Sequence, residues 1–119
     1  MKRLMLIIAL SAFTIAAEAQ SHNSRALIGI WEYSGGTIEF TQDGSGVMKF
    51  KNINRNAPCP EGSVTAFNWE VVDGSKLYLD YKSMHICGEK QPTPENDTPK
   101  SFNVSRNQLS WAGVNWTRM

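Results

Sequence analysis

The stretch LIGIWEY, residues 27–33, opens the folded part of this chain, and NWTR, residues 115–118, closes it. In the first stretch Trp31 and Tyr33 fall on one face of an alternating pattern and Glu32 falls on the other. This period of two is typical of a β-strand with one face turned inward. We expect the two stretches to be neighbouring strands that close a small antiparallel barrel.

The segments between these two stretches also alternate, and each ends at a turn. Asp-Gly pairs at 43–44 and 73–74 are typical of tight β-hairpins. Longer breaks at 52–63 and 83–99 contain Pro and Gly. Residues 20–25 are polar, and we expect them to form a loose leader. The expected strands are 29–33, 37–41, 47–51, 64–72, 76–82, 101–105, 108–112 and 114–118. They predict an all-β fold, a small eight-stranded antiparallel up-and-down barrel.

The strand directions place the turns and loops at opposite ends of this barrel. If the first strand runs up, the tight turns at 43–44, 73–74 and 106–107 all lie at the bottom. Both long breaks then lie at the top. The last strand runs down beside the first, which brings Arg118 next to Trp31 at the closed end.

The N-terminus has the pattern of a secretory signal peptide at 1–19. A basic start precedes an apolar run from Leu4 to Ala17, and Ala17-Glu18-Ala19 is an A-x-A cleavage site. The apolar run is shorter than the roughly 20 residues of a membrane-spanning helix. We therefore expect cleavage, a periplasmic or secreted domain at 20–119, and no membrane span in the mature chain.

Net charge argues against nucleic acid as a partner. Removal of Lys2, Arg3 and Glu18 takes the basic residues from 12 to 10 and the acidic residues from 11 to 10. The mature domain is then formally neutral and has no run of charge. Nucleic-acid binding requires a concentrated basic face, which this composition does not supply.

The two cysteines are expected to form a disulfide. An exported chain meets an oxidising compartment, in which the pair Cys59 and Cys87 is expected to be bonded. The alternative is a metal site that uses Cys87 and His85, but no CxxC or HxxH spacing supports a zinc set. We therefore expect no metal and no other cofactor.

The opening stretch carries a resemblance to a known family. Gly29-Ile30-Trp31 resembles the G-x-W motif of lipocalins, and Arg118 stands where that family's last-strand Arg would pack across the Trp. The chain is similar to compact bacterial lipocalin-like (calycin-type) barrel domains. It is shorter than a typical lipocalin, and no helix is expected after the last strand. These departures argue against a large cavity.

The resemblance implies structural roles for Trp31, Trp116 and Arg118. Arg118 as a merely solvated C-terminal charge is the alternative.

The inward-facing positions are rich in aromatic rings. An eight-stranded barrel is wide enough to be filled by side chains or to hold one small ligand. Both alternatives stay open: the rings fill the core, or they line a pocket for a small hydrophobic molecule. The strand directions put the upper inward residues around any such pocket. These expected ligand-binding residues are Tyr33, Ile38, Phe50, Phe67, Tyr81 and Phe102.

No catalytic motif is evident. The sequence has no G-x-S-x-G, no H-E-x-x-H and no phosphate-binding loop, and His22 and His85 have no evident nucleophile near them. We expect a non-enzymatic protein that binds a small apolar ligand. The alternative is a protein-binding barrel whose long loops, near 54–62 or 85–94, inhibit a cell-wall hydrolase or similar enzyme. A cavity inside the barrel would favour the first hypothesis, and a filled core would favour the second.

Overall fold

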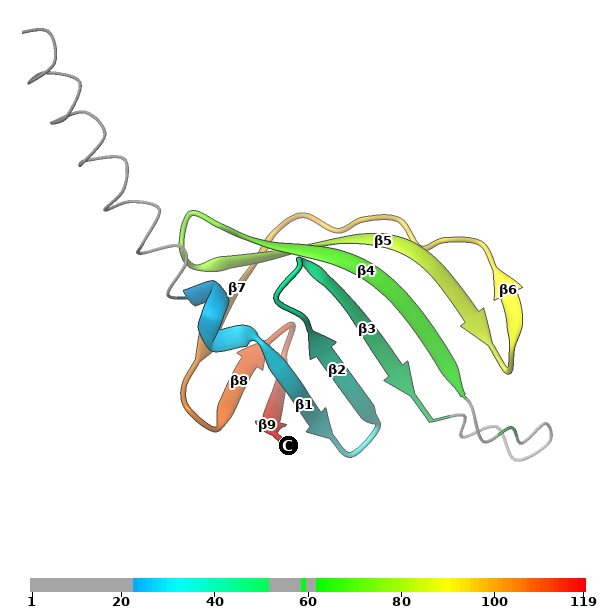
Figure 1. Cartoon of the computed structure of the whole chain (residues 1–119), viewed down its shortest axis with the longest axis horizontal. Helices are drawn as coiled ribbons and strands as arrows, with labels where there is room; N and C mark the ends of the chain where they lie inside the picture. Colours follow the sequence, from blue (N-terminus) through cyan, green and yellow to red (C-terminus); the bar gives the residue numbers. More distant parts are fainter. Residues whose placement is uncertain (1–22, 52–58, 60–61) are drawn as a thin grey trace, which may run out of the picture.

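The computed structural model describes residues 23–51, 59 and 62–119. The expected signal peptide, His22 and most of the loop near 54–62 lie outside this part of the chain. Within it the chain forms a short helical segment at 23–27 and then nine strands. The strands are β1 (Gly29–Tyr33), β2 (Gly36–Phe40), β3 (Ser45–Phe50), β4 (Ser63–Val72), β5 (Lys76–Ile86), β6 (Glu89–Gln91), β7 (Lys100–Val104), β8 (Gln108–Trp111) and β9 (Val114–Arg118) (Figure 1).

Eight of these strands form a closed antiparallel barrel. The order β4-β3-β2-β1-β9-β8-β7-β5 is closed by the pairing of β4 with β5, and β6 is added to the upper half of β5. The first and last barrel strands pair with Trp31 opposite Arg118. The all-β, up-and-down barrel predicted from the sequence is confirmed, and its architecture is consistent with a lipocalin-like fold.

The largest error among the predicted strand bounds is the end of the fifth strand, and the other bounds differ by at most two residues. The sequence ended the fifth strand at residue 82, but β5 continues to Ile86 and forms a hairpin with β6. The cause is a β-bulge: Ala66 pairs with Ser83 and Phe67 with Tyr81, which leaves Lys82 as an extra residue. Inward-facing side chains therefore fall on odd-numbered residues before Lys82 and on even-numbered residues after it. The alternation of apolar and polar residues breaks at this point, so it did not predict that the strand continues.

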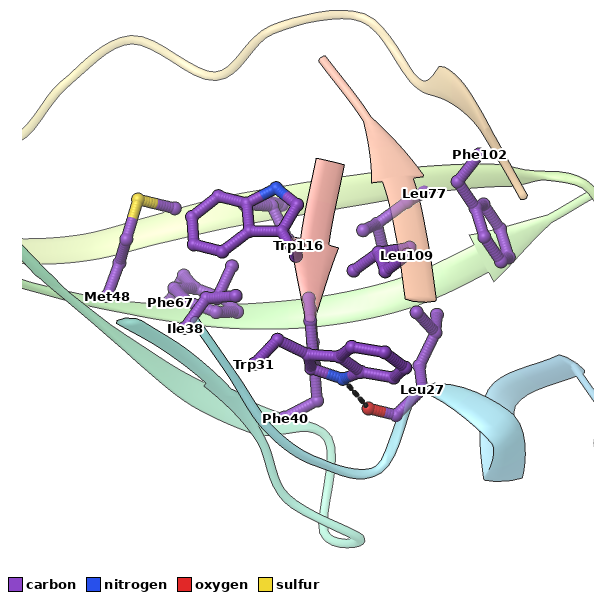
Figure 2. Close-up of a cluster of buried hydrophobic side chains, with 11 residues drawn as sticks. Leu27, Trp31, Ile38, Phe40, Met48, Phe67, Leu77, Phe102, Leu109 and Trp116 are labelled. Atoms are coloured by element: carbon purple, nitrogen blue, oxygen red, sulfur yellow. Dashed lines mark hydrogen bonds between the residues drawn. The ribbon is translucent and has the colours of Figure 1, made fainter. Parts of the chain in front are cut away.

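The hydrophobic core occupies the closed end of the barrel. Its largest fully buried side chains include Trp31, Phe40 and Phe67. Figure 2 shows Trp31 below Leu109 and Leu77, with Leu27 beside its indole. The Trp31 Nε1–H donates to the Leu27 carbonyl at 2.9 Å. Residues 23–25 thus belong to the helical segment and not to the loose leader expected from the sequence.

Arg118 closes the barrel at the same end. Its Cζ lies 4.2 Å from the centroid of the Trp31 ring. Its guanidinium also donates to three backbone carbonyls: Nη1 to Ile28 at 3.0 Å, Nη2 to Ala26 at 2.7 Å and Nε to Arg106 at 2.9 Å. The last strand is thereby joined both to the entry segment and to the turn before β8.

Gly29 makes room for this arrangement. Its φ of +136° lies in a region that L side chains rarely adopt. A Cβ at this position would also lie 2.7 Å from the Arg118 Nη1. The glycine of the G-x-W stretch is therefore required both by its backbone conformation and by the approach of the arginine.

The part of the chain that the structure describes contains no helix long and apolar enough to cross a membrane.

Candidate functional site: a cavity at the open end of the barrel

A cavity of about 220 Å³ lies above the hydrophobic core. It forms because two neighbouring barrel strands have unequal lengths. β7 pairs with β5 only at Lys76–Ser101 and Leu77–Lys100, so the upper part of β5 has no β7 strand beside it. Figure 1 shows β4 and β5 extending well beyond the short strands β8 and β9. The cavity walls come from β1, β3, β5, β8, β9, the turn between β8 and β9, the segment that precedes β7 and the first residue of β7.

Most of the wall is aromatic or aliphatic. Tyr33 packs edge-on against Trp116, with ring centroids 4.6 Å apart, and against Phe50 at 6.1 Å. Such contacts hold the rings in fixed orientations. Met48, Leu77, Leu79 and Trp116 line the cavity and also belong to the buried core. The remaining apolar lining residues are Tyr81, Trp111, Ala112 and Val114.

The polar rim comes from the segment at 92–99 and the start of β7. Asn96 fastens this segment to β5, because its Oδ1 accepts from the Tyr81 backbone N–H at 2.8 Å and its Nδ2 donates to the Asp80 carboxylate at 3.0 Å. Asp97 forms an exposed ion pair with Lys100 at 3.6 Å. Asp97, Thr98 and Lys100 line the opening.

Two side chains on β5 near the cavity have shifted pKa values. Burial raises the pKa of the Tyr81 phenol, and the negative charge of Asp97 adds to this effect. Tyr81 therefore remains a neutral hydroxyl donor at neutral pH. Hydrogen bonds from Lys82 and Asn96 lower the pKa of Asp80, which lies on the outside of the same strand.

The six expected ligand-binding residues are divided between the cavity and the core. Tyr33, Phe50 and Tyr81 line the cavity. Ile38, Phe67 and Phe102 do not: their exposed fractions are 0%, 1% and 7%, and they pack within the hydrophobic cluster.

Several wall residues were missing from the sequence-based set. Trp111 and Val114 stand at the upper ends of β8 and β9, so the same direction argument could have placed them at the opening. Trp116 was assigned only a structural role. Asp97 and Lys100 had no recognisable signal, because the course of the segment before β7 depends on tertiary contacts.

A disulfide lies beyond the cavity, at the turn between β5 and β6. Cys59 and Cys87 are bonded, with 5.6 Å between their Cα atoms, as the sequence predicted. The Cys87 N–H also donates to the Gly62 carbonyl at 2.8 Å. The start of β4 is thus tied to the turn between β5 and β6.

The residues that the structure describes contain no group of three or more His, Cys, Asp or Glu side chains close enough to hold an ion.

Comparison with protein families, curated proteins and solved structures gives no match for this chain. The fold defines the class as a closed antiparallel β-barrel, and this architecture is compatible with a binding protein.

Proposed function

We propose that this protein is a non-enzymatic, exported binding protein for a small apolar ligand, which it holds in the cavity at the open end of the barrel. The observation that carries the proposal is the cavity itself, because a completely filled interior would leave no place for a ligand. Its lining of aromatic and aliphatic side chains with a few polar groups at the rim is the usual composition of small-molecule sites.

The cavity volume limits the size of the ligand. The value of about 220 Å³ exceeds the roughly 150 Å³ of an engineered cavity that admits benzene. It is below the about 300–1,000 Å³ of pockets for drug-sized molecules. The ligand therefore has on the order of ten non-hydrogen atoms, such as a single substituted ring. Long-chain lipids are too large to be enclosed.

Export is supported by the disulfide, which persists in oxidising compartments. It is also supported by the N-terminal sequence pattern. Mass spectrometry of the protein from the producing cell should show a mature N-terminus near residue 20. An intact Met1 on a cytosolic product would contradict export.

The binding proposal is tested by calorimetric titration with a panel of small substituted benzenes. We expect one or more to bind the wild-type protein with a dissociation constant in the micromolar range. Val114→Phe, which adds a ring at the cavity wall, should weaken this binding at least about tenfold. Val47→Phe is the matched control, because Val47 lies on β3 away from the cavity lining. Failure of the whole panel to bind, or equal affinity for Val114→Phe, would overturn the proposal.

A protein-binding role is the second candidate, and one feature favours it. The β5–β6 hairpin extends beyond the short strands, is tied by the disulfide and exposes 40% of Ile86 (Figure 1). Such a stiffened projection is suited to insertion into a partner, for example the active site of a cell-wall hydrolase. The cavity in the interior favours the ligand-binding proposal over this one.

A further inference from the structure

Two residues of the cavity wall carry buried hydrogen-bond donors that have no acceptor in the part of the chain that the structure describes. They are the buried indole Nε1–H groups of Trp111 and Trp116, two residues that line the cavity. Trp116 as a whole is 3% exposed. Figure 2 shows its nitrogen on the edge of the ring that faces away from Trp31. Buried donors without partners are rare in folded proteins, and each requires an explanation.

The indole N–H groups of the other two tryptophans both donate to backbone carbonyls. Trp31 donates to the Leu27 carbonyl at 2.9 Å. Trp69 donates to the Ser45 carbonyl at 2.9 Å and to the Thr41 carbonyl at 3.2 Å. The unpaired indoles are therefore confined to residues that line the cavity, and the paired ones lie outside its lining.

The chemistry of the indole restricts what can pair with it. An indole nitrogen only donates, so its partner must be an acceptor. A carbonyl oxygen has two lone pairs and can accept from two donors.

Charge distinguishes a carbonyl from a carboxylate. A buried carboxylate needs a cationic partner to offset its loss of water. Lys100 is the only cationic side chain among the cavity-lining residues of the described chain. It stands at the rim, its side chain is 47% exposed, and it is paired with Asp97.

We infer that the ligand of this cavity carries an uncharged carbonyl oxygen that accepts hydrogen bonds from the indoles of Trp111 and Trp116. This inference rests on the proposed binding function and narrows it to a small aromatic or alicyclic ketone, aldehyde, ester or amide. The apolar walls enclose the ring, and the two indoles fix its orientation by its single polar group.

Three probes of nearly equal shape separate these alternatives. Acetophenone has the carbonyl oxygen, α-methylstyrene replaces that oxygen with CH₂, and benzoate replaces the methyl group with a charged oxygen. We expect acetophenone to bind about 3- to 10-fold more tightly than α-methylstyrene, which corresponds to one net hydrogen bond. Benzoate should bind more weakly than acetophenone.

Indole N–H signals in ¹H–¹⁵N NMR spectra report on the contact in the wild-type protein. Acetophenone should move the Trp111 and Trp116 indole proton signals downfield, and α-methylstyrene should not. The paired indoles of Trp31 and Trp69 are internal controls and should be little changed by either probe. This measurement needs no substitution beyond those used for signal assignment.

Substitution gives an independent readout. Trp116→Phe keeps a ring and removes the donor, so the preference for acetophenone over α-methylstyrene should fall to about equality. Trp69→Phe is the matched control, because that indole is already paired and lies outside the cavity lining, and it should keep the preference.

The outcomes separate this inference from the proposed function. Equal or tighter binding of α-methylstyrene, without downfield shifts at Trp111 and Trp116, would overturn the carbonyl inference and leave the binding function standing. Tighter binding of benzoate than of acetophenone would overturn the inference that the acceptor is uncharged. Absence of binding by all three probes and by the wider panel would overturn both.

Discussion

At the scale of single residues, Arg118 connects parts of the chain that are far apart in sequence. Its guanidinium stacks on Trp31 and donates to carbonyls of Ala26, Ile28 and Arg106. A solvated terminal charge would make none of these contacts. Because hydrogen bonds from a charged donor are stronger than neutral ones, the residue contributes more than the stacking expected from the sequence.

A double-mutant cycle measures the coupling of Trp31 with Arg118. Trp31→Ala should cost about 3–5 kcal/mol, as large aromatic core deletions do. Arg118→Ala should cost about 2–4 kcal/mol, since it loses the stacking and the three charge-assisted bonds. The sum should exceed the cost of the double mutant, because residues in contact couple. Urea unfolding gives all three values.

Arg106→Ala, at an exposed arginine, is the control for this cycle, and its free energy of unfolding should lie within about 0.5 kcal/mol of wild type. Strict additivity would contradict the contact.

Gly29→Ala tests the glycine of the opening stretch. The substitution should cost about 3 kcal/mol or more, because the new Cβ combines a strained φ with displacement of the Arg118 guanidinium. Gly74→Ala is the matched control: its φ of +71° is also positive, but no atom lies within 4 Å of the new Cβ. It should cost only about 1 kcal/mol. Thermal unfolding compares the two, and equal costs would show that the approach of Arg118 is unimportant.

At the scale of elements, the β4–β5 hairpin is the longest pairing in the barrel, and its β5 strand forms part of the cavity wall. Its bulge at Lys82 changes which side chains face inward, and its upper end is held by the disulfide. The opposite, closed end is held by tight turns such as 41–45. The open end therefore depends on the disulfide and the closed end on the tight turns. A substitution at one end should change local stability there more than at the other end.

Removal of the disulfide should loosen the open end first. In Cys59→Ser with Cys87→Ser, the loss of a crosslink over 28 residues should cost about 3–4 kcal/mol. Hydrogen exchange should accelerate at the Cys87-position amide, which bonds to Gly62. Amides around Trp31 should be affected only through the global loss of stability. Uniform acceleration at both ends would contradict this separation.

The turn at 41–45 should make stability depend on pH. Asp43 accepts bonds from the Ser45 and Thr41 side chains and from the Ser45 N–H, which lower its pKa from 3.8 to about 2. A lowered folded-state pKa gives stability that is present above pH 3.8 and is lost as pH falls through about 2. Asp43→Asn should therefore be less stable than wild type at pH 5, and the difference should narrow at pH 2. An unchanged difference in urea unfolding at the two pH values would refute the role of the ionised carboxylate.

At the scale of the whole molecule, the cavity exists because the barrel is closed by strands of unequal length. The segment at 92–99 takes the place of a strand along the upper part of β5, and Asn96 is its attachment to that strand. We therefore expect this segment to limit access to the cavity from this side.

Asn96→Ala should release this segment from β5. The Tyr81 amide loses its acceptor, so its hydrogen exchange should accelerate at a stability cost of about 0.5–1.5 kcal/mol. Ligand dissociation should become faster, which stopped-flow fluorescence with acetophenone can measure. Asn103→Ala, at an exposed position on β7, is the control and should leave both rates unchanged. Unchanged rates in Asn96→Ala would show that the segment does not limit access.

The sequence by itself determined the strand pattern, the barrel closure and the disulfide. The strands and their closure depend on local alternation, on turn residues such as Asp-Gly and on the parity of strand directions. The disulfide followed from the even pair of cysteines in a chain expected to be exported. The role of Trp31 as an inward, closed-end residue followed from the same parity. Only the tertiary structure decided the bulge at Lys82, the hairpin to Ile86 and the boundary between cavity and core. A bulge is set by pairing with a distant strand, and a cavity depends on how far each strand extends beside its neighbours, so neither leaves a local pattern.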